Sequence, residues 1–139
     1  MEIAVCVKRV PLVGSVFVLT DDSMSIDTSR IGATLSPHEE NAVEAAVRLI
    51  ETHGGSITLF SVGGADAEEQ LREQLAIGAD RAVLIDTEGV EIDSKATAAL
   101  LAQAIKDDST DFDLVILGSE SADSGGYQTG IRIAHALDR

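Results

Sequence analysis

The amino-acid sequence predicts an α/β fold, an open doubly wound parallel sheet with helices on both faces. Four short runs rich in β-branched residues alternate with segments whose apolar residues recur at helical spacing. The runs are apolar on both faces rather than alternating, which is typical of buried parallel strands. Because crossovers between parallel strands are right-handed, we expect the strands in the order 3-2-1-4.

The chain of 139 residues has the size of one ordinary domain. Between the first strand and the first helix, Phe17 and Leu19 stand beside a polar turn at Asp21-Asp22-Ser23. Residues 16–27 therefore predict a small β-hairpin. The four main strands are expected at residues 3–7, 57–62, 82–85 and 114–117.

The first helix has a clear start and a clear end in the sequence. Ser36 stands at the N-cap, Pro37 at the first helical position and Glu39 three residues after the cap, which is the pattern of a capping box. Gly54 and Gly55 end the helix.

Three further helices are expected after the remaining strands. Asp66 and Glu69 have cap spacing at the start of the second helix, and Asp93 or Ser94 caps the third. The helices are expected over residues 66–77, 94–105 and about 126–137.

The composition excludes several classes of function. Lys and Arg number 10 against 24 Asp and Glu, for a formal net charge of -14, whereas nucleic-acid binding needs clustered cations. No apolar run has the length of a membrane span, and the first residues read as a strand rather than a signal peptide. We expect a soluble, cytoplasmic protein with no nucleic-acid partner and no membrane insertion. One Cys and three separated His show no metal-site spacing.

The turn after the fourth strand is the most informative segment. Residues 118–130 read GSESADSGGYQTG, and ligands of doubly wound sheets bind where such turns leave strands at the reversal of strand order. Gly125 and Gly126 would allow close approach of the backbone and positive φ, and the next helix offers free N–H groups. Because the turn has no Lys or Arg, it either binds an anion through backbone groups or only connects strand to helix.

Other candidate residues also have ordinary structural explanations. Cys6, inside an apolar strand, fits a core thiol. Lys8 and Arg9 fit solvated charges at a strand end as well as anion ligands. Asp123 is expected to accept backbone N–H groups or a ribose hydroxyl rather than to face phosphate. No catalytic constellation follows from the spacing, so the sequence predicts no enzyme.

Four segments together resemble the β subunit of electron-transfer flavoprotein. They read VCVKRVP, SPHEENAVEAAVRLIE, LREQLAIGADRAVLI and DLVILGSESADSGGYQTG, in the same order along the whole chain. The resemblance implies an electron carrier that binds AMP, or a second FAD as in bifurcating relatives. It implies pairing with an electron-transfer flavoprotein α subunit that holds most of the FAD. Acyl-CoA or other dehydrogenases would donate the electrons, which pass to the respiratory chain.

By position, the resemblance places the ligand between the first strand, the first helix, the second strand and the Gly-rich turn. His38 would approach the flavin side of the interface. The implied cofactor-binding residues are Cys6, Ser36, Pro37, His38, Glu39, Val62, Gly118, Ser119, Glu120, Ser121, Asp123, Ser124, Gly125, Gly126, Tyr127, Gln128 and Thr129.

The sequence departs from the family pattern in three ways. Ser36 replaces the usual Asn, and Ser119 and Glu120 replace Lys-Gln, which removes a cation and adds an acid. These changes leave open a lower nucleotide affinity or a different adenylate. The family also continues well beyond the equivalent of Arg139. We therefore expect residues 1–139 to form a single adenine-nucleotide-binding domain, truncated relative to the family.

Two other classes of protein remain as alternatives. A free-standing ATP- or AMP-binding stress-type domain expects a G-x-x-G phosphate loop with a later Gly-Ser step, which IRIAHALDR does not supply. A PP-loop enzyme expects S-G-G-x-D-S directly after the first strand, where VKRVP stands.

Overall fold

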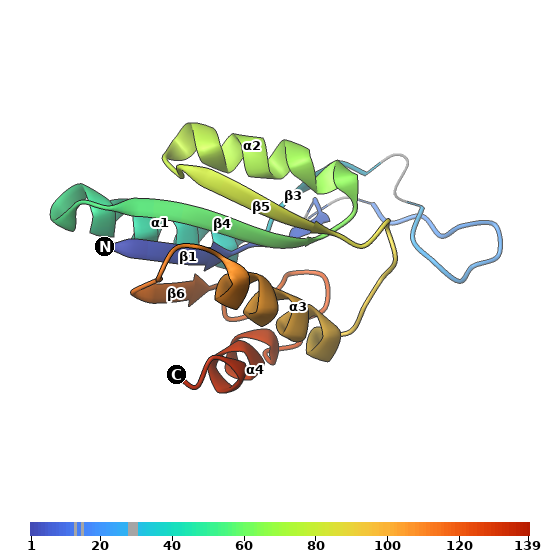
Figure 1. Ribbon diagram of the computed structural model, residues 1–139. Coiled ribbons are helices and arrows are strands. Elements are labelled where there is room, and N and C mark those ends of the chain that lie inside the picture. Colours follow the sequence, from blue (N-terminus) through green and yellow to red (C-terminus); the bar gives the residue numbers. More distant parts are fainter. Residues whose placement is uncertain (13, 15, 28–30) are drawn as a thin grey trace.

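The computed structural model describes residues 1–12, 14, 16–27 and 31–139, and it confirms the predicted α/β fold. Four parallel strands form one sheet in the order β5-β4-β1-β6, which is the predicted order 3-2-1-4 (Figure 1). Among the described residues, no helix is long and apolar enough to cross a membrane. The elements are β1 (Glu2–Cys6), β2 (Arg9–Pro11), β3 (Ala33–Leu35), α1 (Pro37–His53), β4 (Ser56–Gly63), the 3-10 helix η2 (Ala65–Ala67), α2 (Glu68–Ile77), β5 (Arg81–Asp86), α3 (Ser94–Asp107), β6 (Leu114–Leu117) and α4 (Thr129–Ala136).

Strand β1 is the centre of the sheet. Val5 pairs with Leu59 of β4 on one side and with Ile116 of β6 on the other. Ile3, Ala4 and Val5 have no solvent exposure. Successive residues of a strand point to opposite faces, so β1 contributes side chains to both faces of the sheet.

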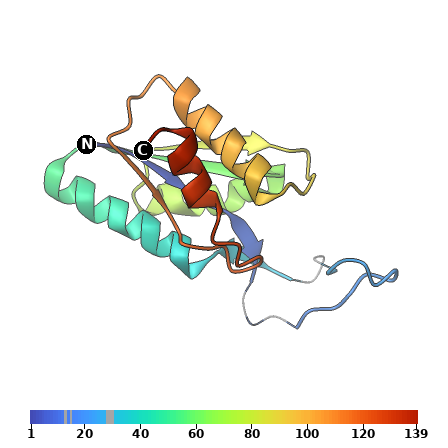
Figure 2. The ribbon, with the colours of Figure 1, turned by 90° about the horizontal axis from the view of Figure 1, so that it is seen from below.

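Two hydrophobic cores lie on these two faces. Ile3 and Val5 pack in one core with residues of α1 and α2, and Ala4 and Cys6 pack in the other with residues of α3 and α4. Helices α3 and α4 lie side by side on the second face (Figures 1 and 2). Helices on both faces are therefore confirmed.

The sequence signals for helix starts are confirmed at α1 and α3 and are wrong at α2. At α3, the Asp93 side chain accepts a hydrogen bond from the backbone N of Ala96 at 2.8 Å. At α2, Asp66 does not cap the helix: Ala65–Ala67 forms η2, and Asp66 pairs instead with Arg9, at 3.0 Å between Nη1 and Oδ2. Arg9 of β2 therefore binds the carboxylate that the sequence predicted as the cap of α2.

Helix α4 begins later than the sequence predicts. It starts at Thr129 rather than at about Gly126. Gly125 and Tyr127 have φ of +57° and +54°, in the left-handed region, so the chain cannot run helically through them. The Gly-rich turn therefore extends through Gln128.

A hairpin follows β1 as predicted, but its paired strands, β2 and β3, lie outside the predicted segment 16–27. Arg9 pairs with Leu35 and Pro11 with Ala33 in the antiparallel β2–β3 sheet. Within the predicted segment 16–27, the described ladder is a single bridge between Leu19 and Ile26. The hairpin therefore continues beyond β2 and β3 as a thin arm.

The packing of Phe60 generates a prediction about stability. Phe60 is fully buried and meets Phe112 edge to face, with ring centroids 5.6 Å apart and an interplanar angle of 81°. Phe60→Ala should lower the free energy of unfolding by about 3–5 kcal/mol, because it removes apolar contacts and leaves a cavity. Urea denaturation measures this, and Val90→Ala, at an exposed position, is the control. A loss below about 1 kcal/mol for Phe60→Ala would contradict the described packing.

Candidate functional site

Three segments meet at the carboxyl ends of β1 and β6. They are the residues that follow β1, the start of α1 and the turn 118–128 that follows β6 (Figure 2). The connections from β1 lead outward to β4 and β5, and the chain then returns to the other side of β1 as β6. The strand order therefore reverses between β1 and β6, and ligands of open α/β sheets bind at such a point.

Gly118 is the residue that lets the turn pass the start of α1. A Cβ at Gly118 would lie 2.9 Å from the Cβ of His38 and 3.1 Å from the backbone N of Glu39. Around Gly126 a Cβ would meet nothing within 4 Å, and its φ is not positive. Within the chain, the turn approaches α1 closely at Gly118 and not at Gly126, and the expected approach of the Gly126 backbone to an anion stays a prediction. The prediction of positive φ is confirmed at Gly125 alone of the two glycines.

A buried carboxylate lies at the start of α1. Glu39 accepts a hydrogen bond from the backbone N of Ser36 at 3.2 Å, and the Ser36 side chain accepts one from the Glu39 backbone N, as a capping box requires. The Ser36 hydroxyl also donates to the Glu39 carboxylate at 3.1 Å. Burial raises the pKa of Glu39, although the hydrogen bonds from Ser36 and the backbone and charge of Lys8 act to lower it. The Glu39 carboxylate, which forms part of the α1 cap, therefore also lies beside the candidate site.

Cys6 ends β1 beside this acid. It is buried, and desolvation together with the nearby charge of Glu39 raises the pKa of its thiol from 9.0 to about 12. Burial disfavours the thiolate, so the thiol stays protonated and unreactive at neutral pH. The structural interpretation of Cys6 as a core thiol is confirmed.

Charged side chains of the turn pair with neighbouring cations. Lys8 Nζ lies 2.6 Å from Asp123 Oδ2, and the hydroxyls of Ser121 and Ser124 are 2.8 Å apart. Burial acts to raise the pKa of Asp123, but hydrogen bonds from Lys8 and Ser121 and the charge of Lys8 outweigh it and hold the pKa below its usual range. Asp123 therefore neutralises Lys8, and a hydrogen bond from its own backbone N–H also acts to lower its pKa. Its expected contact with a ribose hydroxyl stays a prediction.

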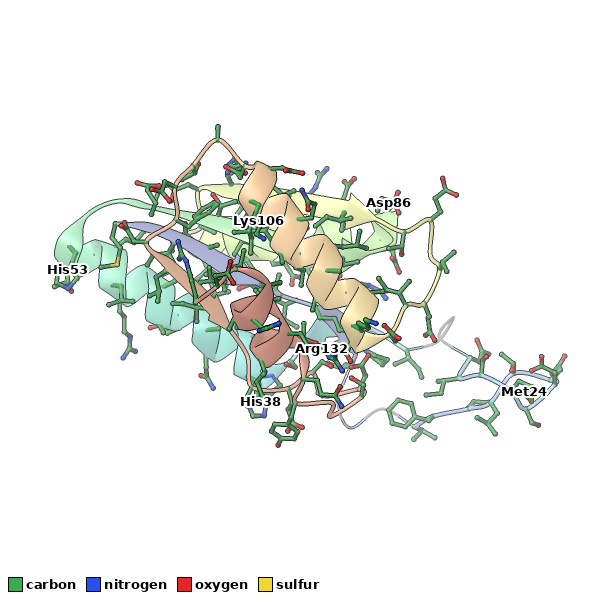
Figure 3. The ribbon with its side chains drawn as sticks, turned by 60° about the horizontal axis from the view of Figure 1, so that its bottom comes forward. Met24, His38, His53, Asp86, Lys106 and Arg132 are labelled. Atoms are coloured by element: carbon green, nitrogen blue, oxygen red, sulfur yellow. The ribbon has the colours of Figure 1, made fainter. Side chains whose placement is uncertain are left out.

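A second set of contacts joins the turn to α1 through His38, which lies beside the turn in Figure 3. Its Nδ1 is 3.0 Å from the hydroxyl of Ser119, and its Nε2 is 3.4 Å from Glu120 Oε1. The hydrogen bond and charge of Glu120 raise the pKa of Tyr127. Glu120 therefore lies between the histidine and the tyrosine hydroxyl, where the family pattern has Gln.

The remaining predicted site residues lie at the ends of the elements that border the turn 118–128. Val62 is near the end of β4, half-buried against the core that contains Cys6. Pro37 is the first residue of α1, and Gln128 and Thr129 stand at the start of α4. The turn closes on itself through a hydrogen bond from the Gly125 backbone N to the Ser121 carbonyl, at 2.9 Å.

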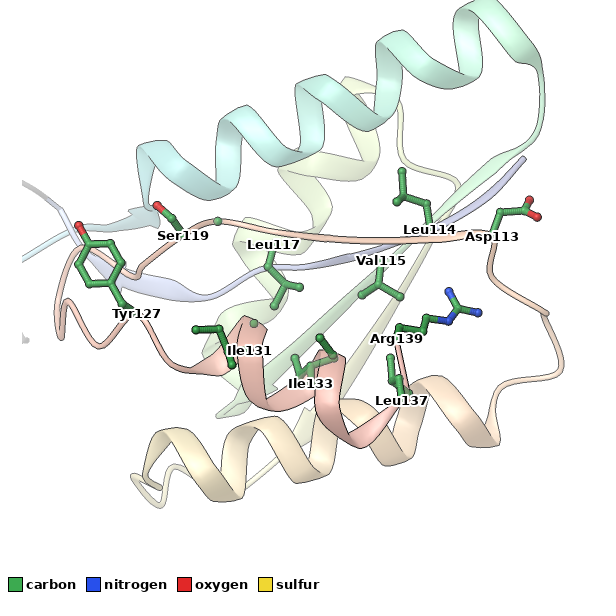
Figure 4. Close-up of a pocket in the computed structure, with 13 residues that line it drawn as sticks. Asp113, Leu114, Val115, Leu117, Ser119, Tyr127, Ile131, Ile133, Leu137 and Arg139 are labelled. Atoms are coloured by element: carbon green, nitrogen blue, oxygen red, sulfur yellow. The ribbon is translucent and has the colours of Figure 1, made fainter.

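A groove of about 580 Å³ lies between β6 and α4 and was not identified from the sequence (Figure 4). Its lining is largely apolar, with Ser119 and Tyr127 of the turn at one end and Arg139 at the other. The sequence does contain one indication of this groove, because Ile131 stands two residues before the buried Ile133. Residues at this spacing are about 200° apart on a helix, so they cannot both face the core.

The fold and the turn define an open α/β domain whose strand order reverses between β1 and β6. The chain belongs to the electron transfer flavoprotein domain family, whose model matches residues 23–139.

Relatives of the chain include electron transfer flavoprotein β subunits and a protein named FixA. The chain is 40% identical over 126 residues to the electron transfer flavoprotein subunit beta of Bacillus subtilis, covering 86% of this chain and 48% of that protein. It is 37% identical over 141 residues to the subunit beta of Thermoanaerobacterium thermosaccharolyticum, covering 99% and 52%. It is 35% identical over 142 residues to protein FixA of Rhizobium meliloti, covering 99% and 48%. The chain thus spans about half the length of these curated relatives.

The contrast between two glycines generates a prediction. Gly118→Ala should lower the free energy of unfolding by about 1–3 kcal/mol, because its Cβ would overlap the backbone and Cβ atoms of α1. The matched control Gly126→Ala should change it by less than about 0.5 kcal/mol, since its Cβ enters open space. Urea denaturation of the two variants measures the difference. Equal destabilisation would contradict the described approach of the turn to α1.

The raised pKa of Cys6 generates a second prediction. Its pKa of about 12, against 9.0 for an ordinary thiol, lowers the thiolate fraction at pH 8 about 1000-fold. Burial also blocks access, so the native chain should react with a disulfide thiol reagent at least about 1000 times more slowly than the chain unfolded in urea. Absorbance of the released thiolate follows both rates. Comparable rates would show that Cys6 is accessible in the folded protein.

Proposed function

We propose that this chain is an electron-transfer flavoprotein β-type domain that binds an adenine nucleotide between the turn 118–128 and the start of α1. AMP is the expected ligand, and FAD is the alternative. The observation that carries the proposal is the meeting of the Gly-rich turn with α1 at the reversal of strand order, in a chain that belongs to this family.

Backbone groups are the expected phosphate ligands. The nearest cation, Lys8, is engaged by Asp123, so it presents no unopposed positive charge, and the His38 ring is in contact with Glu120. The start of α4 would supply N–H groups, and both α1 and α4 begin beside the turn, where the positive ends of their dipoles lie. A phosphate that reached His38 would have to displace Glu120. We therefore expect weaker phosphate binding here than in relatives that have Lys and Gln in place of Ser119 and Glu120.

The wider role follows from the family and extends beyond the described domain. The β-type domain would pair with a FAD-carrying α subunit in the cytoplasm. The pair would carry electrons from acyl-CoA or other dehydrogenases to the respiratory chain. The chain itself would be a carrier subunit rather than an enzyme, with the adenine nucleotide as a structural ligand.

The position of Ser119 gives the proposal a specific test. Ser119→Lys places a cation beside His38 and should strengthen AMP binding about two- to fivefold at low salt, an amount typical of one exposed charge pair. The gain should shrink at high salt as the attraction is screened. The matched control is Ser109→Lys, which adds the same charge in the exposed connection before β6 and should leave the affinity within about twofold.

Isothermal titration calorimetry with AMP measures these affinities, and parallel titrations with FAD compare the two ligands. Equal gains from Ser119→Lys and Ser109→Lys would mean that net charge alone, not this site, attracts the nucleotide. If neither the wild-type chain nor Ser119→Lys binds AMP or FAD, the proposed nucleotide site is wrong.

A further inference from the structure

A second pocket, named the helix pocket from here on, lies between α1 and α2 and has a volume of about 280 Å³. Both helices cover the core that contains Ile3 and Val5, whereas the groove beside β6 lies against α4 on the other face of the sheet. The lining residues are Glu40, Asn41, Val43 and Glu44 of α1 and Gln74 and Ile77 of α2. None of these residues belongs to the candidate nucleotide site, so the helix pocket is a separate feature of the chain.

Gln74 contributes a buried amide to the helix pocket. The residue is 5% exposed, and it lines the pocket from α2. In the part of the chain that the structure describes, its side chain makes no hydrogen bond. A buried amide without a partner is unfavourable, and nearly all buried polar groups in proteins are hydrogen-bonded. The Gln74 amide therefore needs a polar group from outside the chain, which is either water or a ligand.

Two carboxylates of α1 line the same pocket. Glu40 and Glu44 are four residues apart and therefore share one face of the helix. Glu44 Oε1 accepts a hydrogen bond from Arg48 Nε at 2.7 Å, whereas Glu40 has no ion pair with any described residue. Like charges at this spacing repel each other. A cation between the two carboxylates would remove this repulsion, so the helix pocket favours a positively charged ligand.

The lining of the helix pocket favours an organic cation over a metal ion. Among the residues that the structure describes, no group of three or more His, Cys, Asp and Glu is placed to hold a metal ion. The side chains of Val43 and Ile77 give the pocket apolar walls. A hard divalent ion binds oxygen ligands and gains nothing from such walls.

An alkylammonium ion matches both the polar and the apolar part of the lining. Its head carries three N–H donors, as the ammonium group of lysine does, and Glu40, Glu44 and the Gln74 amide offer oxygen acceptors. Its alkyl stem can lie along apolar side chains while the head stays with the carboxylates. Ligand pockets commonly measure about 300–1,000 Å³. The volume of about 280 Å³ therefore indicates a small ligand.

We propose that the helix pocket binds a small primary alkylammonium ion. Glu40, Glu44 and the Gln74 amide oxygen hold its head, and Val43 and Ile77 contact its stem. Free alkylamines and lysine side chains both carry this group. The inference does not depend on the proposed nucleotide site, because the two sites share no residue.

The test follows the amide NMR resonances of the isotope-labelled full chain during titration with n-butylammonium. Saturable shifts are expected at residues 40–44 of α1 and 74–77 of α2, and not at the turn 118–128. The neutral analogue 1-butanol should bind at least about tenfold more weakly, because it lacks charge-assisted hydrogen bonds. A titration with Nα-acetyl-lysine amide compares the two sources of the group. Tighter binding than that of n-butylammonium assigns the pocket to a lysine side chain of a peptide or protein, and weaker binding assigns it to a free alkylamine.

Two variants test the residues that hold the head. Glu40→Gln and Gln74→Met should each weaken the binding of n-butylammonium about fivefold, because each removes a hydrogen-bond acceptor for the charged group. The matched control is Glu51→Gln, which removes the same charge about 10 Å or more further along α1. Its affinity should stay within about twofold of the wild type, because salt screens charges at this distance. Glu40 is exposed, so Glu40→Gln decides the matter if circular dichroism shows that Gln74→Met impairs folding.

Three results would overturn the proposal. Equal weakening by Glu40→Gln and Glu51→Gln would mean that net charge, not the helix pocket, attracts the cation. Equal affinities for n-butylammonium and 1-butanol, or shifts that do not saturate, would mean that the pocket does not recognise the ammonium group. Tighter binding of Mg²⁺ than of n-butylammonium at the same residues would identify a metal site instead.

Discussion

The burial of β1 on both faces and along both edges is the constraint on which the rest of the structure depends. A buried strand must have its backbone groups paired, and β4 and β6 supply these partners on either side. Its side chains divide between the two cores, so each layer of helices is anchored to the same strand. The carboxyl ends of β1 and β6 are thereby fixed next to each other, and the Gly-rich turn must leave the sheet beside the start of α1.

Local features of the sequence were sufficient to predict most of the fold. The four main strands were predicted to within about one residue at each end, because runs of β-branched residues identify buried strands directly. The start of α1 was predicted from Ser36, Pro37 and Glu39, because the capping interactions between Ser36 and Glu39 are local. The start of α4 was not, because nothing in the sequence indicated that Tyr127 adopts positive φ. Such a conformation is unusual for a bulky residue and depends on its surroundings.

The site was predicted less completely, because its interactions join distant parts of the chain. The sequence showed several glycines in the turn but not which one passes close to α1, since the obstacle at Gly118 is His38 and Glu39. The sequence likewise placed Lys8 and Asp123 in separate segments, and their ion pair exists only once β1 and β6 are neighbours. Lys8 is thus already neutralised within the chain. An anion that bound to Lys8 would have to replace its ion pair with Asp123.

The position of β6 has a consequence for how the domain behaves in solution. One side of β6 pairs with β1, and no described strand pairs with the other side, which borders the apolar groove. An open edge of this kind is a template for pairing with another chain. The negative charge of every copy opposes such contacts, but salt screens this repulsion beyond about 8 Å at physiological ionic strength. The colloidal stability of the chain therefore depends on the ionic strength of the solution. Contact between the edges of β6 is therefore expected to be opposed more strongly in dilute buffer than in concentrated salt.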